Sequence, residues 1–243
     1  MAIGEVAGRD SAAAIIKAAS YDSIEAILPT LVYTGTEYGN WATTYENVDY
    51  VGDLVKRNYR KRFYEPVLLG DAELWWALNG RFLSTLIEKF GFLSPCIGCH
   101  LYMHLVRIPL AREVGCTKII SGERTKHDRK IKINQTDIAL DAYKEVLDFA
   151  GVELILPVRE IFRGKEIDVL VGGNWDEGQK QLQCVLRGNY KCTDDRVLYD
   201  ERKAKKFVDS YIVPVGKKMI EAWNEKAKVD YIAIVRSVLV NSK

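Results

Sequence analysis

Short apolar runs alternate with longer segments of helical pattern along the first two thirds of the chain. The apolar runs, whose lengths and flanking turns are typical of buried strands, lie at residues 2–6, 26–33, 66–69, 118–121 and 152–157. The segments of helical pattern lie at residues 11–20, 43–62, 71–90, 99–114 and 136–150. This alternation predicts an α/β fold, with a mostly parallel sheet that carries helices on both faces.

Start and stop signals set the expected ends of these helices. Asp71 is a candidate N-cap, and glycines end three of the segments at Gly91, Gly115 and Gly151. The pattern changes after about residue 165, where a Gly-Gly pair and a Cys-containing loop precede a charged helix at residues 199–224. We therefore expect one domain over residues 1–165 and a small C-terminal extension over residues 166–243.

Composition narrows the class of protein. The 243 residues include 48% hydrophobic and 28% charged residues, and the 35 basic and 33 acidic side chains nearly cancel, which does not indicate a nucleic-acid binder by bulk charge. The basic and aromatic residues at 57–63 are either a local contact patch or a solvated helix face. No run of 18 apolar residues and no secretory signal is present, so we expect no membrane span and a cytoplasmic location.

A candidate phosphate loop follows the first expected strand. Gly8, Asp10 and Ser11 stand between that strand and a helix, where bare backbone N–H groups and the helix dipole favour an anion. Ser11 adds a hydroxyl, and Asp10 is able either to cap the helix or to orient a magnesium-bound group. The alternative is a simple strand-to-helix turn with a capping Asp.

Cys96 and Cys99 form a two-thiol corner after Pro95. An odd count of five cysteines does not indicate a disulfide framework, and Cys-x-x-Cys in a reducing compartment is typical of a metal or redox site. The alternatives are a redox dithiol and two ordinary buried thiols. Cys184 or Cys192 could complete a set of three, and Cys116 is expected in the core.

A polar cluster at residues 121–128 follows the fourth expected strand, and its density of donors suits an anionic ligand or, alternatively, a solvated loop. His100 and His104, four residues apart on one helix, could bind a metal, although we favour packing or helix-end roles. Gly35, Gly122 and the turn at Pro157 also follow strand ends. In a parallel sheet these ends meet at one edge, so we expect the turns to converge there.

These motifs resemble the PP-loop, or N-type, ATP pyrophosphatase superfamily, and within it the tRNA-thiolating enzymes that carry an iron–sulfur cluster. The family's loop reads Ser-Gly-Gly-x-Asp-Ser, and Gly8, Asp10 and Ser11 match its second Gly, its Asp and its final Ser. The resemblance covers about residues 2–165.

The middle of the chain carries more of the resemblance. The family shows Cys-x-x-Cys, a basic helix, Ala-x-x-x-Gly, a strand and a polar loop, and this chain has the cysteine pair, Arg107, residues 111–115 and the loop that begins at Gly122. Glu123 stands where the family usually has His. Residues 157–159, Pro-Val-Arg, resemble the family's Pro-Leu-Arg turn.

The resemblance implies an adenine nucleotide alpha hydrolase-like fold and an enzyme that adenylates a substrate oxygen with ATP and replaces it with sulfur. It implies ATP, Mg²⁺ and a [4Fe-4S] cluster as cofactors, with zinc as the alternative metal. The implied cluster ligands are Cys96, Cys99 and Cys184, with Cys192 as the alternative third ligand. The implied catalytic residues are Asp10, Cys96 and Cys99. The implied nucleotide or substrate contacts are Gly8, Asp10, Ser11, Gly35, Gly122, Arg124, His127 and Lys132.

The expected partners are a tRNA or small-molecule substrate and a sulfur donor, and a homodimer is possible. Two other functions stay open from the sequence. One is a zinc-containing PP-loop ligase or amidotransferase that delivers nitrogen. The other is a non-catalytic nucleotide-binding protein with a regulatory role.

Overall fold

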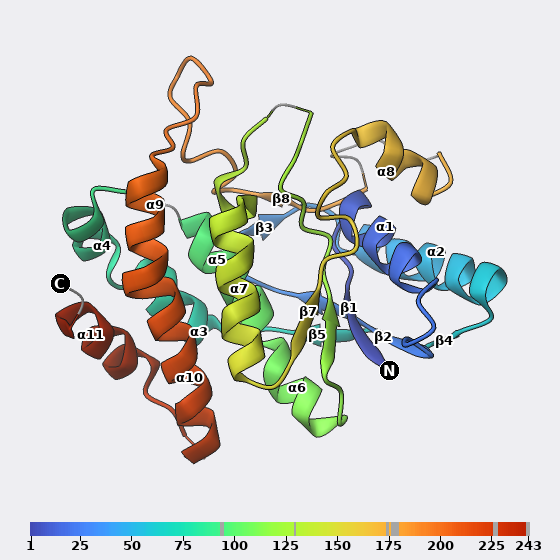
Figure 1. The fold of residues 1–243 in the computed structure, drawn as a ribbon, viewed down its shortest axis with the longest axis horizontal. Coiled ribbons are helices and arrows are strands. Elements are labelled where there is room, and N and C mark those ends of the chain that lie inside the picture. The colour runs from blue at the N-terminus through green and yellow to red at the C-terminus, as the bar shows by residue number, and fades with distance from the viewer. Residues whose placement is uncertain (93–94, 129, 174, 176–179, 226–227, 242–243) are drawn as a thin grey trace.

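A six-stranded parallel sheet forms the centre of the molecule (Figure 1). The computed structural model describes residues 1–92, 95–128, 130–173, 175, 180–225 and 228–241. The strands are β1 (Ala2–Glu5), β2 (Ala26–Val32), β4 (Arg62–Phe63), β5 (Val67–Leu69), β6 (Lys118–Ile120) and β7 (Glu153–Ile155). Their order is β4-β2-β1-β6-β7, and β5 pairs with the later part of β2 beyond β4. The predicted α/β fold with a mostly parallel sheet is confirmed.

β1 lies at the centre of this sheet and all four of its residues are buried. It pairs in parallel with β2 on one side and with β6 on the other. The chain leaves β1 toward β2 and later returns to the opposite side of β1, so the strand order reverses here. Crevices for ligands open at the carboxyl ends of the strands at such a reversal.

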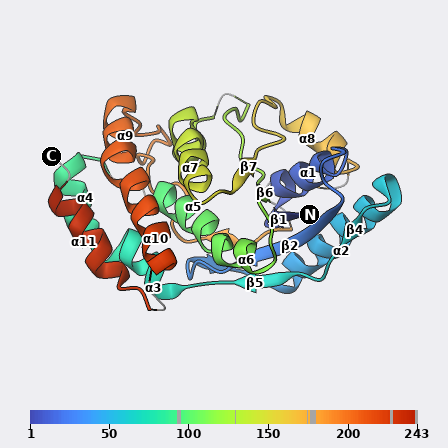
Figure 2. The same cartoon turned by 60° about the horizontal axis from the view of Figure 1, so that its bottom comes forward.

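Two groups of helices cover the two faces of the sheet, as Figures 1 and 2 show. α1 (Arg9–Ala18), α2 (Ala42–Tyr59) and α8 (Gly164–Leu170) pack against one face and share one hydrophobic core. α5 (Pro95–Leu105), α6 (Arg107–Glu113) and α7 (Asp137–Phe149) cover the other face. A short 3₁₀ turn, Ile133–Gln135, precedes α7, whose N-cap Thr136 accepts a hydrogen bond from the N–H of Ala139.

The segment at residues 71–90 differs from the expected single helix. Asp71 is the N-cap, and its Oδ1 accepts a hydrogen bond from the N–H of Leu74 at 2.9 Å, as predicted. The helix α3 (Ala72–Trp75) then continues as a π-helical turn (Trp76–Gly80), and α4 (Leu83–Phe90) begins after a break. The break lets Leu74, Leu78 and Leu86 all reach the core, which an uninterrupted helix would not align.

The cysteine helix also begins earlier than expected. α5 starts at Pro95, so Cys96 lies in its first turn rather than before the helix, and Cys99 lies one turn further along instead of at its start. Proline suits the first turn of a helix because its missing N–H has no partner to lose there. Five short or late elements were not predicted: β3 (Glu37–Tyr38), β4, α8, β8 (Gln183–Cys184) and α11 (Tyr231–Asn241).

The last part of the chain forms helices that pack on the same core as α5 and α7. α9 (Glu201–Phe207), a π-helical segment (Val208–Ile212) and α10 (Val213–Glu225) occupy the region where one charged helix was predicted. Phe207, Tyr211 and Met219 are buried in the core cluster that also holds Ile3 and Leu101. The extension at residues 166–243 therefore shares its hydrophobic core with the first 165 residues. Among the described helices, none combines the length and the apolar character that a bilayer crossing requires.

Candidate functional site

The loop between β1 and α1 is closed around the hydroxyl of Ser11. Ser11 Oγ accepts hydrogen bonds from the N–H of Ala7 at 2.9 Å and of Gly8 at 3.1 Å, and it donates to the carbonyl of Gly8 at 2.8 Å. The loop is thereby shaped by its own serine at the N-terminus of a ten-residue helix. Because the N–H groups of Ala7 and Gly8 are bonded to Ser11 Oγ, it is the dipole of α1 that gives this end of β1 the polarity that favours an anion.

Asp10 joins this loop to the loop after β6. Its Oδ2 accepts a hydrogen bond from Nε of Arg124 at 2.9 Å, and its Oδ1 accepts one from Nε of Arg9 at 3.3 Å. Arg124 is fully buried, and Arg9 also reaches Asp168 of α8 at 2.7 Å. Asp10 therefore holds a buried guanidinium beside the phosphate-loop candidate, as a charge-assisted pair.

Gly122 lies against the backbone at the start of α1. A Cβ added to Gly122 would stand 2.3 Å from the N atom of Ser11 and 2.4 Å from its Cα. Real Cβ atoms do not approach backbone atoms this closely, so only glycine fits. Gly122 is required here by a close approach of two backbones rather than by an unusual backbone angle.

Residues 121–124, Ser-Gly-Glu-Arg, each contact a different part of the site. Ser121 Oγ donates to Oε2 of Glu5 at 3.1 Å, and Gly122 packs on α1. Glu123 accepts from imidazoles on α5, and Arg124 donates to the loop after β1. Because Asp10 lies in the first turn of α1, this segment connects the start of α1 to the helix that carries Cys96 and Cys99.

Glu123 binds both histidines of α5. Its Oε1 lies 2.5 Å from Nδ1 of His100 and its Oε2 lies 3.1 Å from Nε2 of His104, while Nε2 of His100 lies 2.7 Å from Nδ2 of Asn134. Burial alone would raise the pKa of Glu123, but His104 and His100 lower it to about 2. The two histidines fix α5 against the β6 loop. The helix-packing role favoured from the sequence agrees with these contacts.

Arg124 and His127 leave polar atoms without partners. Among the described residues, neither Nη2 of Arg124 nor the two ring nitrogens of His127 make a hydrogen bond, although all three atoms are buried. Burial lowers the pKa of His127 to about 4, and the neighbouring cations Lys132 and Arg124 act in the same direction. Excess positive charge and spare donors make this the part of the site most suited to an anion.

Three of the cysteines come together from two segments. Cys96 Sγ lies 3.9 Å from the carbonyl oxygen of Leu186, and the N–H of Leu186 donates to Sγ of Cys184 at 3.4 Å. Cys99 accepts a hydrogen bond from Nε1 of Trp75 at 3.3 Å. Burial, together with the nearby Cys96 and Cys184, raises the pKa of Cys99 to about 12, although the hydrogen bond from Trp75 acts in the opposite direction.

The other two cysteines lie elsewhere. Cys192 is in the loop between β8 and α9, where its N–H donates to the carbonyl of Arg196. Cys116 is buried and its thiol donates to the carbonyls of Met1 and Lys118, as expected for a core residue. Of the two candidates for a third ligand, Cys184 is the one beside the pair. In the described part of the chain, no group of three or more His, Cys, Asp or Glu side chains is placed to hold one metal ion.

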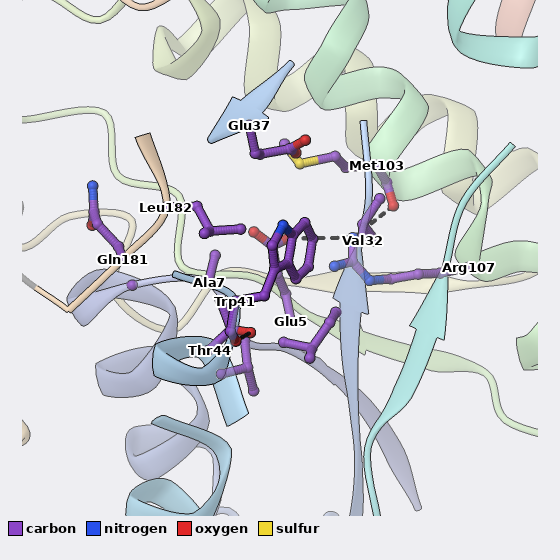
Figure 3. Close-up of a pocket in the computed structure, with 13 residues that line it drawn as sticks. Glu5, Ala7, Val32, Glu37, Trp41, Thr44, Met103, Arg107, Gln181 and Leu182 are labelled. Atoms are coloured by element: carbon purple, nitrogen blue, oxygen red, sulfur yellow. Dashed lines mark hydrogen bonds and ion pairs between the residues drawn. The ribbon is translucent and has the colours of Figure 1, made fainter. Parts of the chain in front are cut away.

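A cavity of about 170 Å³ lies at the carboxyl ends of β1 and β2, beside the phosphate-loop candidate (Figure 3). Its lining residues are Glu5, Val6, Ala7, Gly8, Leu31, Val32, Glu37, Trp41, Thr44, Met103, Arg107, Gln181 and Leu182. Glu37 lines this cavity with Gly8 and also pairs in register with Cys184 of β8, whose thiol contacts Thr36 at 3.3 Å. The phosphate-loop candidate and the Cys184 strand therefore both lie next to Glu37.

Most residues singled out from the sequence lie around this region. Gly8, Asp10, Ser11, Gly122 and Arg124 are on its phosphate-loop side, with His127 and Lys132 near Arg124. Gly35 is exposed, with a φ of 80° and nothing within 4 Å of an added Cβ. It forms the turn whose neighbours Thr34 and Thr36 support Glu37, and it is not part of the cavity wall.

The sequence reasoning did not identify Glu5, Glu37, Trp41 and Arg107 as site residues. Two of them could have been found from the sequence, because each is a charged residue within an apolar run. Glu5 is the one acid in the apolar run at residues 2–6, and Arg107 interrupts the apolar run Leu-Val-Arg-Ile. A charge within a buried apolar segment requires a partner, and these two residues are indeed paired at 3.3 Å.

No family model matches the chain. A protein of Methanocaldococcus jannaschii named "Uncharacterized protein MJ0009" is 39% identical over 240 residues, which covers 98% of this chain and 86% of that protein.

Proposed function

Because the chain belongs to the family of the M. jannaschii protein MJ0009, whose name assigns no activity, we propose a function from the site itself. The function is ATP-dependent replacement of a substrate oxygen by sulfur, with an iron–sulfur cluster on Cys96, Cys99 and Cys184. The proposal includes membership of the PP-loop ATP pyrophosphatase superfamily. The single observation that carries it is Glu37, which lines the cavity beside Gly8 and pairs in register with Cys184 of β8.

The position of the loop after β1 supports the nucleotide part. The loop lies where the strand order reverses, at the N-terminus of α1, which is a favourable place for a phosphate in a parallel sheet. Asp10 holds the buried guanidinium of Arg124 next to this loop. A cation in that position stabilises the charge that develops on a departing pyrophosphate. Asp10 is also the carboxylate that would hold Mg²⁺, in exchange for one of its arginine contacts.

The thiols support the sulfur part. Three thiol sulfurs are a soft donor set of the kind that iron–sulfur clusters use. Ligands on separate irons of a cluster lie farther apart than ligands on one ion, so the absence of a single-ion group in the described part of the chain is compatible with a cluster. When bound, the cluster would supply sulfur at an iron that carries no protein thiolate. Because the pKa of Cys99 is about 12 in the metal-free site, loading would release a proton from its thiol.

The chemistry takes two steps. A substrate oxygen forms a bond to the α-phosphorus of ATP while the bond to pyrophosphate breaks, and the loop at residues 6–11 with Arg124 would stabilise the pyrophosphate. Sulfur then forms a bond to the activated carbon while the carbon–oxygen bond breaks, and AMP leaves with that oxygen. Adenylation makes this possible because AMP is a far better leaving group than hydroxide.

The proposal is tested by making the protein without oxygen and measuring iron, acid-labile sulfide and zinc, then pyrophosphate release with a panel of tRNA and metabolite substrates. We expect about four irons per chain and pyrophosphate release with at least one substrate. Zinc without iron would favour the ligase or amidotransferase alternative. ATP binding with no pyrophosphate from any substrate would favour the non-catalytic alternative. Either result would overturn the sulfur-transfer proposal.

Two variants separate the halves of the site. We expect Asp10→Asn to abolish pyrophosphate release and to leave the iron content unchanged, because the amide keeps the shape of the side chain but loses the charge that holds Arg124. We expect Cys99→Ala to lose iron and to keep ATP binding, because Cys99 is not among the residues that line the cavity. If both variants lose iron to the same extent, the two sites are not separable and the assignment is wrong.

A further inference from the structure

The floor of the cavity is a buried ion pair. Arg107 enters from α6 and its Nη1 lies 3.3 Å from Oε2 of Glu5, at the carboxyl end of β1 (Figure 3). The guanidinium also donates from Nε to the hydroxyl of Thr30 at 2.9 Å and from Nη1 to the carbonyl of Met103 at 2.6 Å. Arg107 is 1% exposed and Glu5 is 9% exposed. Two charges buried this deeply are held in fixed positions by their partners.

Each member of this pair keeps one unused group. Oε2 of Glu5 accepts from Ser121 and faces Arg107, whereas Oε1 of Glu5 makes no hydrogen bond within the described part of the chain. Nη2 of Arg107 likewise makes no hydrogen bond to a described group. Both residues line the cavity, so the floor offers one acceptor and one donor from neighbouring side chains.

The walls of the cavity are apolar. Leu31, Val32, Met103 and Leu182 line it together with the indole of Trp41. Trp41 is held against Tyr33, with ring centroids 5.8 Å apart. At about 170 Å³ the cavity has the volume of about six water molecules. Apolar walls of this size suit a planar ring rather than a whole nucleotide.

We propose that Glu5 and Arg107 bind the edge of a planar nitrogen heterocycle that carries an amino group beside a ring nitrogen, and that they select for this pair of groups. Oε1 of Glu5 accepts from the amino group, and Nη2 of Arg107 donates to the ring nitrogen. Leu182 and Trp41 contact the faces or rim of the ring. The proposal rests on the nucleotide site proposed above, and it assigns the selection of the base to these two side chains.

The energetic reason is the cost of an unpaired buried acceptor. A ring without the amino group would desolvate Oε1 of Glu5 and give it no donor in return, which costs about 1–3 kcal/mol. A cost of that size lowers affinity by about 5-fold to 150-fold. Sites built around a hydrogen bond reject ligands that lack it more strongly than apolar pockets reject a change in size.

The test compares ATP with purine riboside 5′-triphosphate, which lacks the amino group, by calorimetric titration of the full chain. We expect the purine analogue to bind about 5-fold to 150-fold more weakly. Equal affinities would overturn the assignment of Glu5 and leave the nucleotide site standing. If neither compound binds, the proposed function and this inference both fail.

Glu5→Gln and Glu37→Gln provide matched variants, since both acids line the same cavity. Glu37 is held by the backbone and hydroxyl of Thr34, away from Arg107. We expect Glu5→Gln to bring the ratio of the two affinities close to one and Glu37→Gln to keep the ratio of the unaltered protein. The opposite pattern would assign the selection to Glu37. If Glu5→Gln does not fold, the comparison of ATP with purine riboside 5′-triphosphate on the unaltered protein decides whether Glu5 selects the amino group.

Discussion

At the residue scale, Gly122 is the position where the site tolerates least change. Its Cα faces the backbone of Asp10 and Ser11, where an added Cβ would stand 2.3–2.5 Å from main-chain atoms. We expect Gly122→Ala to destabilise the fold by about 3 kcal/mol, because packed backbone cannot move aside as a side chain can. Urea unfolding measures the change.

Gly151→Ala is the control for that variant. Gly151 has a φ of 73° and nothing within 4 Å of an added Cβ, so alanine there meets backbone strain without overlap. Its cost is about 1 kcal/mol. If the two substitutions destabilise the protein equally, then the contact between Gly122 and α1 is not as close as described.

His127 gives a pH dependence with a definite sign. Burial lowers its pKa from an ordinary value of 6.5 to about 4, so the folded protein keeps the ring neutral while the unfolded chain takes up a proton below pH 6.5. Folding stability therefore falls as the pH drops from 6.5 toward 4. We expect His127→Gln to remove about 2 kcal/mol of the stability lost between pH 7 and pH 5.

Urea unfolding at those two pH values checks this expectation. Glu123 contributes little to the change in stability between pH 7 and pH 5, because its pKa of about 2 in the fold and its ordinary value of 4.5 both lie below that range. The stability that Glu123 contributes is complete above pH 4.5 and is lost as the pH falls through 2. An equal loss of stability in the variant and the unaltered protein would show that His127 is charged when folded.

Single residues also show what the sequence could predict about the site. Gly8, Asp10, Ser11 and Arg124 were identified because they follow strand ends, and the ends of parallel strands meet at one edge. Glu37 and Trp41 could not be identified in the same way. They lie in a turn-rich stretch, and their place in the cavity depends on contacts with residues more than 60 positions away, such as Met103 and Leu182.

At the scale of elements, β8 is what brings a third thiol to the pair. It pairs antiparallel with β3 in a separate two-stranded sheet, where Cys184 faces Glu37 in register. Thr36, beside that pair, contacts the thiol at 3.3 Å. Each of these strands has two residues, which is too short for any periodic pattern. Their existence is set by pairing across the chain, and the sequence alone could not separate Cys184 from Cys192.

The strand makes the choice between these cysteines testable. We expect Cys184→Ser to lower the iron bound after anaerobic reconstitution by half or more and to weaken the visible absorbance of the proposed cluster, because one of its three proposed ligands is lost. We expect Cys192→Ser to match the unaltered protein, since its loop lies beyond β8 and holds Cys192 through the backbone of Arg196. The reverse result would exchange the two assignments.

Helix breaks are the other element-scale feature that the sequence did not indicate. The stretch at residues 71–90 has helical pattern throughout, yet the π-helical turn at Trp76–Gly80 divides it. Asn79 lies in that turn, and its Oδ1 stands 2.2 Å from where a Cβ on Gly98 would be. The turn is therefore shaped by close packing against α5, which is a tertiary effect that local propensity does not report.

At the scale of the whole molecule, the parallel sheet and its covering helices followed from the alternation of patterns, because strand and helix periods differ strongly over five repeats. The role of the C-terminal helices did not follow. They contribute Phe207, Tyr211, Val215, Met219 and Ile220 to the core that covers one face of the sheet. Amphipathic helices at the end of a chain carry no sequence signal that says where they dock.

Because the core is shared, the predicted boundary between a domain at residues 1–165 and a C-terminal extension can be tested by expressing the first part alone. We expect residues 1–165 expressed alone to lack cooperative thermal unfolding, because the lost side chains each contribute about 1.5–3 kcal/mol of burial. The full chain is expected to unfold in one transition that coincides by near-ultraviolet and far-ultraviolet circular dichroism. A stable, cooperative fragment would show that the extension is a separate unit.

The contacts of the four residues that follow β6 fix the number of residues in this segment. Each residue from Ser121 to Arg124 has its own contact: Glu5, the backbone of α1, the histidines of α5 and the carboxylate of Asp10, in that order. Inserting or deleting one residue in this segment would shift the register, so that each side chain would face the contact that belongs to the residue next to it. A carboxylate would then face the α1 backbone, where only a hydrogen fits. Relatives that keep these contacts must therefore keep the spacing of this tetrapeptide from its strand.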